Sequence, residues 1–493
     1  MKRGVCVAML LMALCHNAAL SQYNTKENYV WGFGYYAGLN FNSGSPISIQ
    51  TSIHENSPAL EGCASVSDSN GNLLFYCSAD TIWNKNGQVM PNGYGLMQCS
   101  IQGHDTILKG WSTTQGALIA PVIDSPNQYY VFNLEQREYF QAPDSAACRL
   151  FYSIVDMSLN GGNGDVVFGQ KSIPIDSQLS EKMIAVADGN CGLWLLVHGI
   201  GNNIFKAYHI TSAGINMNPV ISTTGNLSGI DAYCDGVMKC SPDRTKIMTS
   251  SNAAYPTGTG LELYDFDAST GIVSNCQTLD HGTSSISDDY YGGCFSPDSK
   301  KLYVSGDVGI RQYDISLSSL SSIINSVTSL YFPSAMLSDL KLGPDNKIYL
   351  GLGFNFDSLD VIDSPNIAGT NCHFVQNAIS LVPGTRASWG LPNEYVKPIC
   401  DLGVKQTTEN ENVFNVYPNP SNGNFTISGT LPDSKEATIE IFNELGQKVY
   451  SETAAMHGEK LNKQLNLYLS PGIYTLHIMA SNGATSIHRL VLY

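Results

Sequence analysis

Residues 296–304 read SPDSKKLYV, a turn of small and polar residues that leads directly into an apolar run. Asp and Pro suit the central positions of a β-turn, and the residues that follow have the composition of a β-strand. The same order occurs in SDSNGNLLFY (67–76), DSPNQYYVF (124–132), ADGNCGLWLLV (187–197), SPDRTKIM (241–248) and GPDNKIYL (343–350). The chain is therefore built on a repeat that contains a turn and a strand.

A second pattern follows each copy, in which Tyr, Phe or Asp closes a strand before a Gly or Ser turn. It is clearest in FKAYHITSAGI (205–215), LELYDFDASTGIVS (261–274) and IRQYDISLSSL (310–320), and weaker in GLMQCSIQG (95–103), FYSIVDMSLNGG (151–162) and LDVIDSPNIAG (359–369). Two hairpins in a repeat of roughly 40–50 residues are typical of a four-stranded β-propeller blade.

The two ends of the repeat region supply the material for one more blade. AGLNFNSGSPISI (37–49) resembles only the second pattern, and RASWGLPNEYV (386–396) offers strand and turn residues without it. Strands from both ends would close the ring in one shared blade, and closure removes exposed sheet edges. We expect an all-β propeller over residues 22–400, with seven blades favoured over six or eight.

The bulk composition agrees with this fold class and narrows the partners. Charged residues make up only 14% of the chain, while Gly (46) and Tyr (26) are frequent, which suits a turn-rich β protein. The formal net charge is −16 and no basic block occurs. Nucleic acid is therefore excluded as a partner, because phosphate binding needs clustered Lys and Arg.

The first 21 residues are typical of a secretory signal peptide. Lys2 and Arg3 precede an apolar stretch at 5–15, which is too short to span a bilayer. Small residues favour cleavage between Ser21 and Gln22. No later apolar run is long enough for a transmembrane helix.

Two of the thirteen cysteines lie in the signal peptide, which leaves eleven. An odd number in an oxidising compartment leaves at least one free thiol or an intermolecular bond. If the turn at 69–71 pairs Asp68 with Asn72, Cys63 lies opposite Cys77 and a cross-strand disulfide becomes a hypothesis. The alternative is two small, half-buried thiols.

The turn aspartates have two interpretations. Their carboxylates favour capping of nearby backbone N–H groups. Calcium is the alternative, because Asp68, Asn70 and Asn72 offer oxygens at alternating positions. An EF-hand loop, however, needs its Gly at the sixth position, and Gly71 comes too early. Capping is favoured, and the sequence indicates no other cofactor.

No catalytic motif is found. His54-Glu55 lacks the second His of a zinc-protease helix, and neither a nucleophile elbow nor a P-loop occurs. His198 and His209 lie in expected strands, where packing is favoured over a ligand role. A propeller hydrolase or lyase needs acidic groups gathered at one face. The candidates for that role are Asp188, Asp235, Asp289 and Glu394.

A second, smaller β unit follows the polar run KQTTENEN (405–412). We expect a linker at 401–412 and an antiparallel, Ig-like sandwich at 413–493, because short alternating runs such as ATIEIFNELGQKVY fill that region. Three of its motifs are YPNPSNGNFTI (417–427), LGQKVY (445–450) and PGIYTLHI (471–478).

In these motifs and their spacing, the C-terminal unit resembles the type A sorting domain of the type IX (Por) secretion system. The matching positions are Tyr417, Pro418, Asn419, Pro420, Gly423, Gly446, Gly472 and Tyr474. The resemblance implies passage through the periplasm and across the outer membrane, with the secretion translocon and its sortase-like peptidase as partners. Cleavage in the linker would leave the propeller on the cell surface or free outside. The final HRLVLY departs from the Lys-containing end that is usual in the family.

The propeller region resembles a group of uncharacterised WD40-like secreted bacterial proteins. The resemblance rests on WGFGYYAGLNFNSGSP (31–46), EGCASVSDSNGNLLFY (61–76) and TIWNKNGQVMPNG (81–93). It implies the fold but no activity.

Two function hypotheses therefore remain. The first is a non-enzymatic module that binds a glycan or protein through loops or the central channel, with Trp83, Trp111 or Trp389 stacking on sugar rings. The second is a polysaccharide-active hydrolase or lyase. The first is favoured, because no catalytic motif is present.

Overall fold

The computed structural model describes residues 23–54, 59–97, 112–136, 148–227, 235–251, 260–281, 290–332, 338–351, 353, 356–400, 414–430, 436–443, 447–455, 460–480 and 485–493. The chain forms two compact units, Met1–Asp401 and Leu402–Tyr493, each described by itself. The expected signal peptide, its cleavage site between Ser21 and Gln22, and the linker at 401–412 lie outside the described residues.

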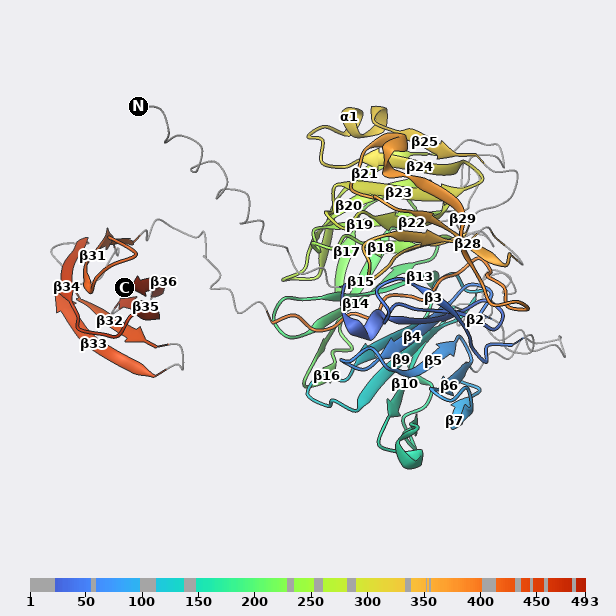
Figure 1. The fold of residues 1–493 in the computed structure, drawn as a ribbon, viewed down its shortest axis with the longest axis horizontal. Coiled ribbons are helices and arrows are strands. Elements are labelled where there is room, and N and C mark those ends of the chain that lie inside the picture. The colour runs from blue at the N-terminus through green and yellow to red at the C-terminus, as the bar shows by residue number, and fades with distance from the viewer. Residues whose placement is uncertain are drawn as a thin grey trace, which may run out of the picture. The chain divides into compact units, whose positions relative to one another are not determined.

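The described part of the first unit contains seven antiparallel sheets that follow one another in chain order (Figure 1). The first three hold β1 (Val30–Phe33), β2 (Ala37–Asn40) and β3 (Ile47–Gln50); β4 (Cys63–Ser67), β5 (Leu73–Ser78), β6 (Thr81–Asn84) and β7 (Val89–Tyr94); and β8 (Ala117–Pro121), β9 (Gln128–Leu134), β10 (Leu150–Asp156), β11 (Asp165–Val166) and β12 (Ile173–Asp176).

The next four sheets continue the series. They hold β13 (Leu179–Ala187), β14 (Leu193–Gly199), β15 (Ile204–Thr211), β16 (Gly214–Ile215) and β17 (Val220–Thr223); β18 (Met238–Cys240), β19 (Lys246–Ser250), β20 (Leu261–Asp267) and β21 (Ile272–Asp280); β22 (Tyr290–Phe295), β23 (Lys301–Gly306), β24 (Gly309–Asp314) and β25 (Thr328–Tyr331); and β26 (Leu340–Leu342), β27 (Ile348–Leu350), β28 (Ser358–Ile362) and β29 (Phe374–Ser380). The short helices are η1 (Lys26–Asn28), η2 (Asn160–Gly162), α1 (Leu320–Asn325) and η4 (Gly369–Cys372).

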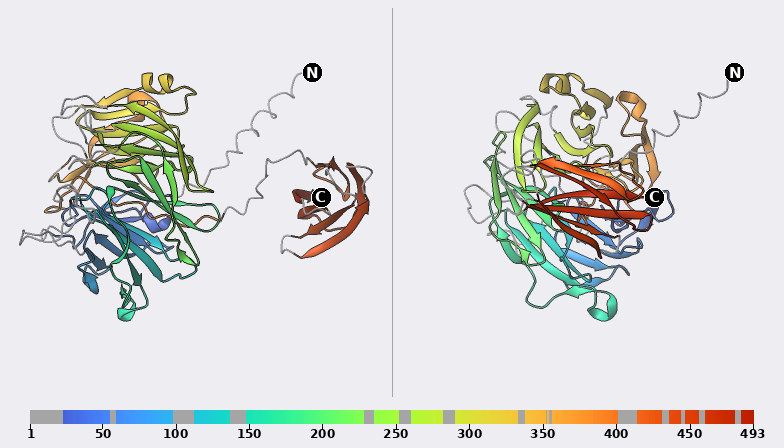
Figure 2. Two further views of the ribbon diagram at one scale, coloured as in Figure 1. Left: turned by 180° about the vertical axis from the view of Figure 1, so that it is seen from behind. Right: turned by 90° about the vertical axis from the view of Figure 1, so that its left-hand side faces the viewer.

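The sheets are arranged around a centre (Figure 2), where the first strands of successive sheets contact one another. Strand β4 lies between β1 and β8, β13 lies between β8 and β18, and β22 lies between β18 and β26. Every residue of β4, β13, β18, β22 and β26 is buried, because both faces of an inner strand pack against other parts of the ring. This radial arrangement is a β-propeller, which confirms the prediction from the repeat.

The two ends of this unit meet beside the first sheet. Tyr35 and Arg386 exchange both backbone hydrogen bonds, at 2.8 and 2.9 Å, in an isolated antiparallel bridge. The C-terminal segment thus reaches the three strands β1–β3, as expected for a shared blade. The blade number of seven stays a prediction.

Turn aspartates cap the backbone, as favoured from the sequence. Asp68 Oδ1 accepts hydrogen bonds from the backbone N–H groups of Asn70 (2.8 Å) and Asn72 (3.0 Å). In the SPD turns, Asp243 Oδ1 accepts from Thr245 N, and Asp298 Oδ1 accepts from Lys300 N. The Asp68 carboxylate suggested for calcium is therefore engaged by its own turn.

The expected pairing of Cys63 with Cys77 is wrong by one residue. A register shift between Val66 and Ser67 places Cys63 opposite Ser78, and Ala64 opposite Cys77. Because neighbouring residues of a strand point to opposite faces, the two thiols do not face each other, and both are free and buried. Burial, the main cause, raises the pKa of Cys77 to about 12.

The second unit is a sandwich of two antiparallel sheets. One has the order β30 (Asn415–Tyr417), β31 (Asn424–Thr430), β34 (Lys460–Asn466); the other has the order β33 (Lys448–Ala455), β32 (Glu436–Phe442), β35 (Gly472–Ala480), β36 (Thr485–Leu492). Buried residues alternate along β32, and Phe425, Ile439, Leu476 and Leu490 belong to one shared core. Among the described residues of both units, no helix has the length and apolar character needed to cross a membrane.

Candidate functional site

The segment 386–400 lies along the innermost strands and occupies the centre of the first unit. Trp389 O accepts a hydrogen bond from Asp339 N, just before β26, at 2.8 Å. On the far side, Asn393 N donates to Cys63 O of β4, and its Nδ2 donates to Ala117 O of β8. In Figure 1 this orange segment passes between the blue and yellow-green sheets. The ring therefore holds part of its own chain where a propeller has its central channel.

The Gln115 amide extends this network to two more sheets. Its Oε1 accepts from Met183 N of β13 and Met238 N of β18, at 3.2 and 2.8 Å. Its Nε2 donates to Asn393 Oδ1 at 3.2 Å. One buried amide thus joins the central segment to inner strands that are distant in sequence, which fixes their relative positions.

Four charged residues form what we call the central ion cluster: Lys239, Lys341, Asp339 and Glu394. Lys239 Nζ lies 2.8 Å from Asp339 Oδ2 and 3.5 Å from Glu394 Oε1, and Lys341 Nζ lies 3.8 Å from Glu394 Oε1. The side chains are only 2–11% exposed. Two ammonium groups and two carboxylates cancel, so the centre carries no net charge from this cluster.

The cluster controls the protonation of its members. Burial by itself would raise the pKa of Glu394, but Lys239 and Lys341 outweigh it and hold that pKa below its ordinary value. Burial likewise would lower the pKa of Lys239, yet its two carboxylate neighbours raise it. Glu394 therefore stays ionised. Lys341 makes one further contact, in which its Nζ lies 5.2 Å from the centre of the Trp31 ring, in the geometry of a cation–π interaction.

The packing of the central segment leaves no room for a larger residue at Gly390. A Cβ at that position would lie 1.8 Å from Glu61 O. Gly390 N also donates to Leu60 O at 3.1 Å, which sets this close approach of two backbones. The glycine is required here by contact with the chain just before β4.

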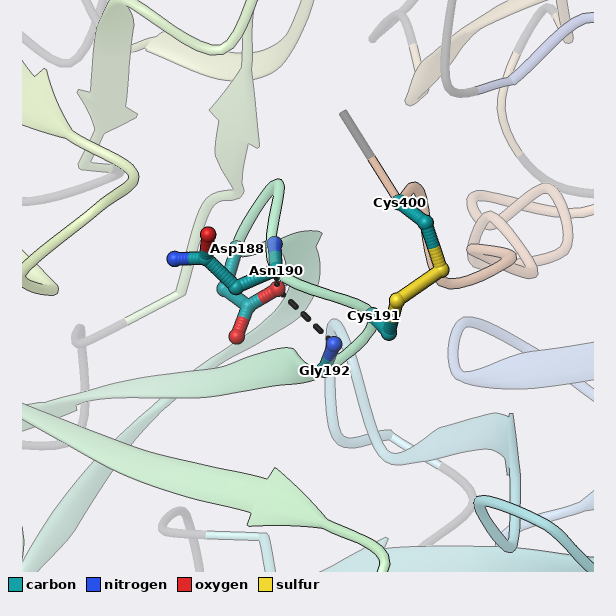
Figure 3. Close-up of a disulfide and its surroundings, with 5 residues drawn as sticks. All are labelled: Asp188, Asn190, Cys191, Gly192 and Cys400. Atoms are coloured by element: carbon teal, nitrogen blue, oxygen red, sulfur yellow. Dashed lines mark hydrogen bonds between the residues drawn. A yellow bond between two sulfur atoms is a disulfide. The ribbon is translucent and has the colours of Figure 1, made fainter. Parts of the chain in front are cut away.

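The end of the segment is covalently attached to the fourth sheet. Cys400 forms a disulfide with Cys191 in the turn between β13 and β14 (Figure 3). Asp188 shapes that turn, because its Oδ1 accepts from Asn190 N at 2.6 Å and from Gly192 N at 2.8 Å. The turn thus presents Cys191 to the end of the central segment.

Two residues near the N-terminus of the unit, Glu27 and Asn28, contact the last part of the central segment. Asn28 Nδ2 donates to Tyr395 O at 2.8 Å, and Asn28 Oδ1 accepts from Tyr395 N at 3.1 Å. Lys397 forms an ion pair with Glu27 at 3.0 Å. The disulfide at Cys400 and the contacts of the N-terminal residues therefore both hold the central segment in place.

The described acidic candidates from the sequence do not all lie together. Glu394 lies in the central ion cluster. Asp235 lies near this cluster, because burial and the charges of Glu61, Asp235 and the cluster member Asp339 all raise the pKa of Tyr291. Asp188 lies in its turn, 2.8 Å from His209 Nε2, and that imidazole stacks on Trp194. Asp289 is outside the described residues.

The aromatic candidates also separate. Trp83 is 1% exposed and stacks on Tyr76 in the core, so the idea that it stacks on a sugar ring is wrong. Trp389 is half-buried, and Trp111 lies outside the described residues. His198 is buried against Phe205, as the packing interpretation expects.

Sequence reasoning missed the two central lysines and the disulfide. The lysines did leave a signal: MKCSPD and LKLGPD place Lys239 and Lys341 at the same position of the repeat, inside an otherwise apolar strand. Nothing in the local sequence pairs Cys191 with Cys400, which are 209 residues apart.

The motif residues of the second unit gather at two places. Asn419 contacts the last strand, where its Oδ1 accepts from Val491 N at 2.9 Å. Gly423 has a φ of 99°, and a Cβ there would lie 2.2 Å from Leu467 O. Tyr474 donates its hydroxyl to Ser470 O at 2.7 Å, just before Gly472. Gly446 lies outside the described residues.

Residues 415–493 match the family described as the secretion system C-terminal sorting domain. The second unit is a type IX sorting domain. It directs the chain through the type IX secretion machinery to the cell surface or the extracellular space. The match covers the second unit alone, so it assigns a route rather than an activity.

Comparisons of the whole chain add no activity. No curated protein matches it. A periplasmic gluconolactonase of Pseudomonas aeruginosa is 9% identical over 79% of this chain and 96% of its own, with a TM-score of 0.34. A Bacteroides thetaiotaomicron protein of unknown function is 10% identical over 76% of this chain and 98% of its own, with a TM-score of 0.26. A Bacillus subtilis glycoside hydrolase family 43 arabinoxylan arabinofuranohydrolase is 9% identical over 76% of this chain and 94% of its own, also with a TM-score of 0.26. Likenesses this weak carry no argument about function.

Proposed function

We propose that the propeller is a non-enzymatic binding module that holds a glycan at the cell surface or outside the cell. The central segment carries this proposal. It occupies the place where a propeller ligand could enter the ring, and it brings its own carboxylate, Glu394, to two lysines. Binding therefore uses the partly exposed start of the central segment and the loops around it, and the buried remainder of the segment serves as a rigid support.

The state of Glu394 argues against that residue as the general acid of a hydrolase. A general acid that protonates a glycosidic oxygen needs a raised pKa. Glu394 has a lowered pKa, and its side chain is 11% exposed. Burial raises the pKa of Asp339, but its carboxylate is almost fully buried and lies 2.8 Å from Lys239. The two carboxylates are engaged with ammonium groups, which suits a structural role.

Trp389 is the proposed contact to the sugar. It is half-buried at the start of the central segment, and its backbone is held by Asp339. A partly exposed indole on a fixed backbone suits stacking on the apolar face of a sugar ring.

The test uses the mature chain on a panel of plant, algal and microbial polysaccharides, with retention and reducing-end release scored on the same samples. We expect retention without release, at least tenfold weaker in Trp389→Ala and preserved in Trp389→Phe. New reducing ends, lost on substituting Asp339, would make the protein a polysaccharide hydrolase instead. Absence of retention on every polysaccharide would replace the glycan with a protein ligand.

We also propose two processing events on the export route. Signal cleavage falls between Ser21 and Gln22, and the sortase-like peptidase of the secretion system removes the sorting domain within residues 405–412, where the chain is polar. A secreted product that keeps Tyr493, found by mass spectrometry, would contradict the second event.

A further inference from the structure

The last strand of the sorting domain lies at the end of its sheet, and the YPNP motif closes its outer side. Strand β36 pairs with β35 on one side only. On the other side, Asn419 Nδ2 donates to Arg489 O at 2.5 Å, and Asn419 Oδ1 accepts from Val491 N at 2.9 Å. One side-chain amide thus makes the two hydrogen bonds that a neighbouring strand would make.

The backbone of Ser421 continues this pairing to the end of the chain. Ser421 N donates to Val491 O at 2.9 Å, and Tyr493 N donates to Ser421 O at 3.0 Å. Ser421 and Leu492 form a parallel bridge. Four outward-facing backbone groups, Arg489 O, Val491 N, Val491 O and Tyr493 N, are therefore bonded to Asn419 or Ser421.

The two prolines explain why a side chain is needed. Pro418 and Pro420 have no backbone N–H, so the chain on either side of Asn419 cannot donate to β36. The asparagine amide supplies a donor and an acceptor in their place. The next residue with a usable N–H is Ser421, which resumes pairing through its backbone.

The motif is itself held to the other sheet of the sandwich. Ser421 Oγ accepts from Gly423 N at 3.1 Å and donates to Asn424 O at 2.8 Å, at the start of β31. Gly423 O in turn accepts from Leu467 N, next to β34. The motif therefore links the β30–β31–β34 sheet to the free side of β36.

We propose that Asn419 is a positioning residue of the export signal: it holds the C-terminal strand on the sandwich, so that the type IX translocon meets residues 489–493 in place. Without the amide, the outer side of the end of β36 opens more often, while β36 stays paired with β35 and Leu490 stays in the core. This inference rests on the export assignment and is independent of the glycan proposal.

The test follows secretion of the full chain in a bacterium with a type IX system. Asn419→Ala removes both bonds, and Asn419→Asp keeps the acceptor for Val491 N while losing the donor to Arg489 O. The matched control is Asn443→Ala, because the Asn443 amide likewise donates to and accepts from one neighbouring residue, Gln447, just before β33. The secreted fraction, the periplasmic fraction and amide exchange at residues 489–493 are measured.

In Asn419→Ala, we expect the backbone amide hydrogen of Val491 to exchange about tenfold faster. The reason is that the loss of two weak hydrogen bonds raises the population of the open state by about that factor. Its secreted fraction should fall by a similar factor, with Asn419→Asp intermediate and Asn443→Ala near wild type. Normal secretion of Asn419→Ala would overturn the proposal. So would an equal loss in Asn443→Ala at equal thermal stability, because that result would assign Asn419 a merely structural role.

Discussion

The disulfide between Cys191 and Cys400 should contribute strongly to the stability of the propeller. It joins residues 209 positions apart, so the bond closes a very long loop in the unfolded chain. The chain-entropy relation for a loop of that length gives about 5 kcal/mol at 25 °C, and measured disulfides commonly fall at about 2–4 kcal/mol. We expect the double variant Cys191→Ser/Cys400→Ser to lose about 2–5 kcal/mol of unfolding free energy.

Urea unfolding followed by tryptophan fluorescence measures this loss in the propeller alone. All five tryptophans belong to the first unit, so the sorting domain does not contribute to the fluorescence. A reductant should shift the wild-type curve onto that of the double variant and leave the variant unchanged. Cys276→Ser, which removes a free thiol, is the control for the substitution itself.

Two results would refute the reasoning. In the first, the reductant leaves the wild-type curve where it was. In the second, thiol titration in urea finds as many reactive thiols before reduction as after, where we expect at least two fewer before reduction. Either result would mean that Cys400 is not bonded to the β13–β14 turn.

The remaining predictions concern buried charge. Glu394→Ala should cost about 3–5 kcal/mol, because it leaves Lys239 and Lys341 buried with less compensation; a loss below about 1 kcal/mol in the same urea assay would contradict this. His198 has its pKa lowered by burial to about 3, from 6.5 when unfolded. Between those values the unfolded chain binds more protons, so stability falls as the pH drops below about 6.5. His198→Leu should flatten that fall between pH 7 and 4, and equal slopes would exclude His198 as its source.

The repeat and the sorting domain could be predicted because each is identified by short, continuous sequence patterns. In SPDSKKLYV the Asp and Pro act on backbone groups two or three residues away, and the apolar run that follows needs only burial of its side chains. The structure accordingly shows Asp298 capping its own turn. The motif at 417–427 can be identified from its own residues, although its contacts reach Leu467 and Val491.

The register of Cys63 and the environment of Trp83 could not be predicted as easily. A single bulge between Val66 and Ser67 moves Cys63 from opposite Cys77 to opposite Ser78, and no residue in the turn demands that bulge. Trp83 is of a residue type that can stack on a sugar ring, yet it packs in a buried core that includes residues of the neighbouring sheet. Small shifts in packing decide both outcomes.

The two kinds of information differ in how far they reach along the chain. Turn chemistry and strand alternation act over a few residues, and the sorting motifs can be identified from their own residues, so the sequence already specifies an exported all-β chain of two units. The central ion cluster joins residues 239, 339, 341 and 394, and the disulfide joins residues 191 and 400. Those groups meet only after the ring closes and residues 386–400 lie along its inner strands. A buried charge needs a partner of opposite charge, and the local sequence around it does not indicate which residue that partner is.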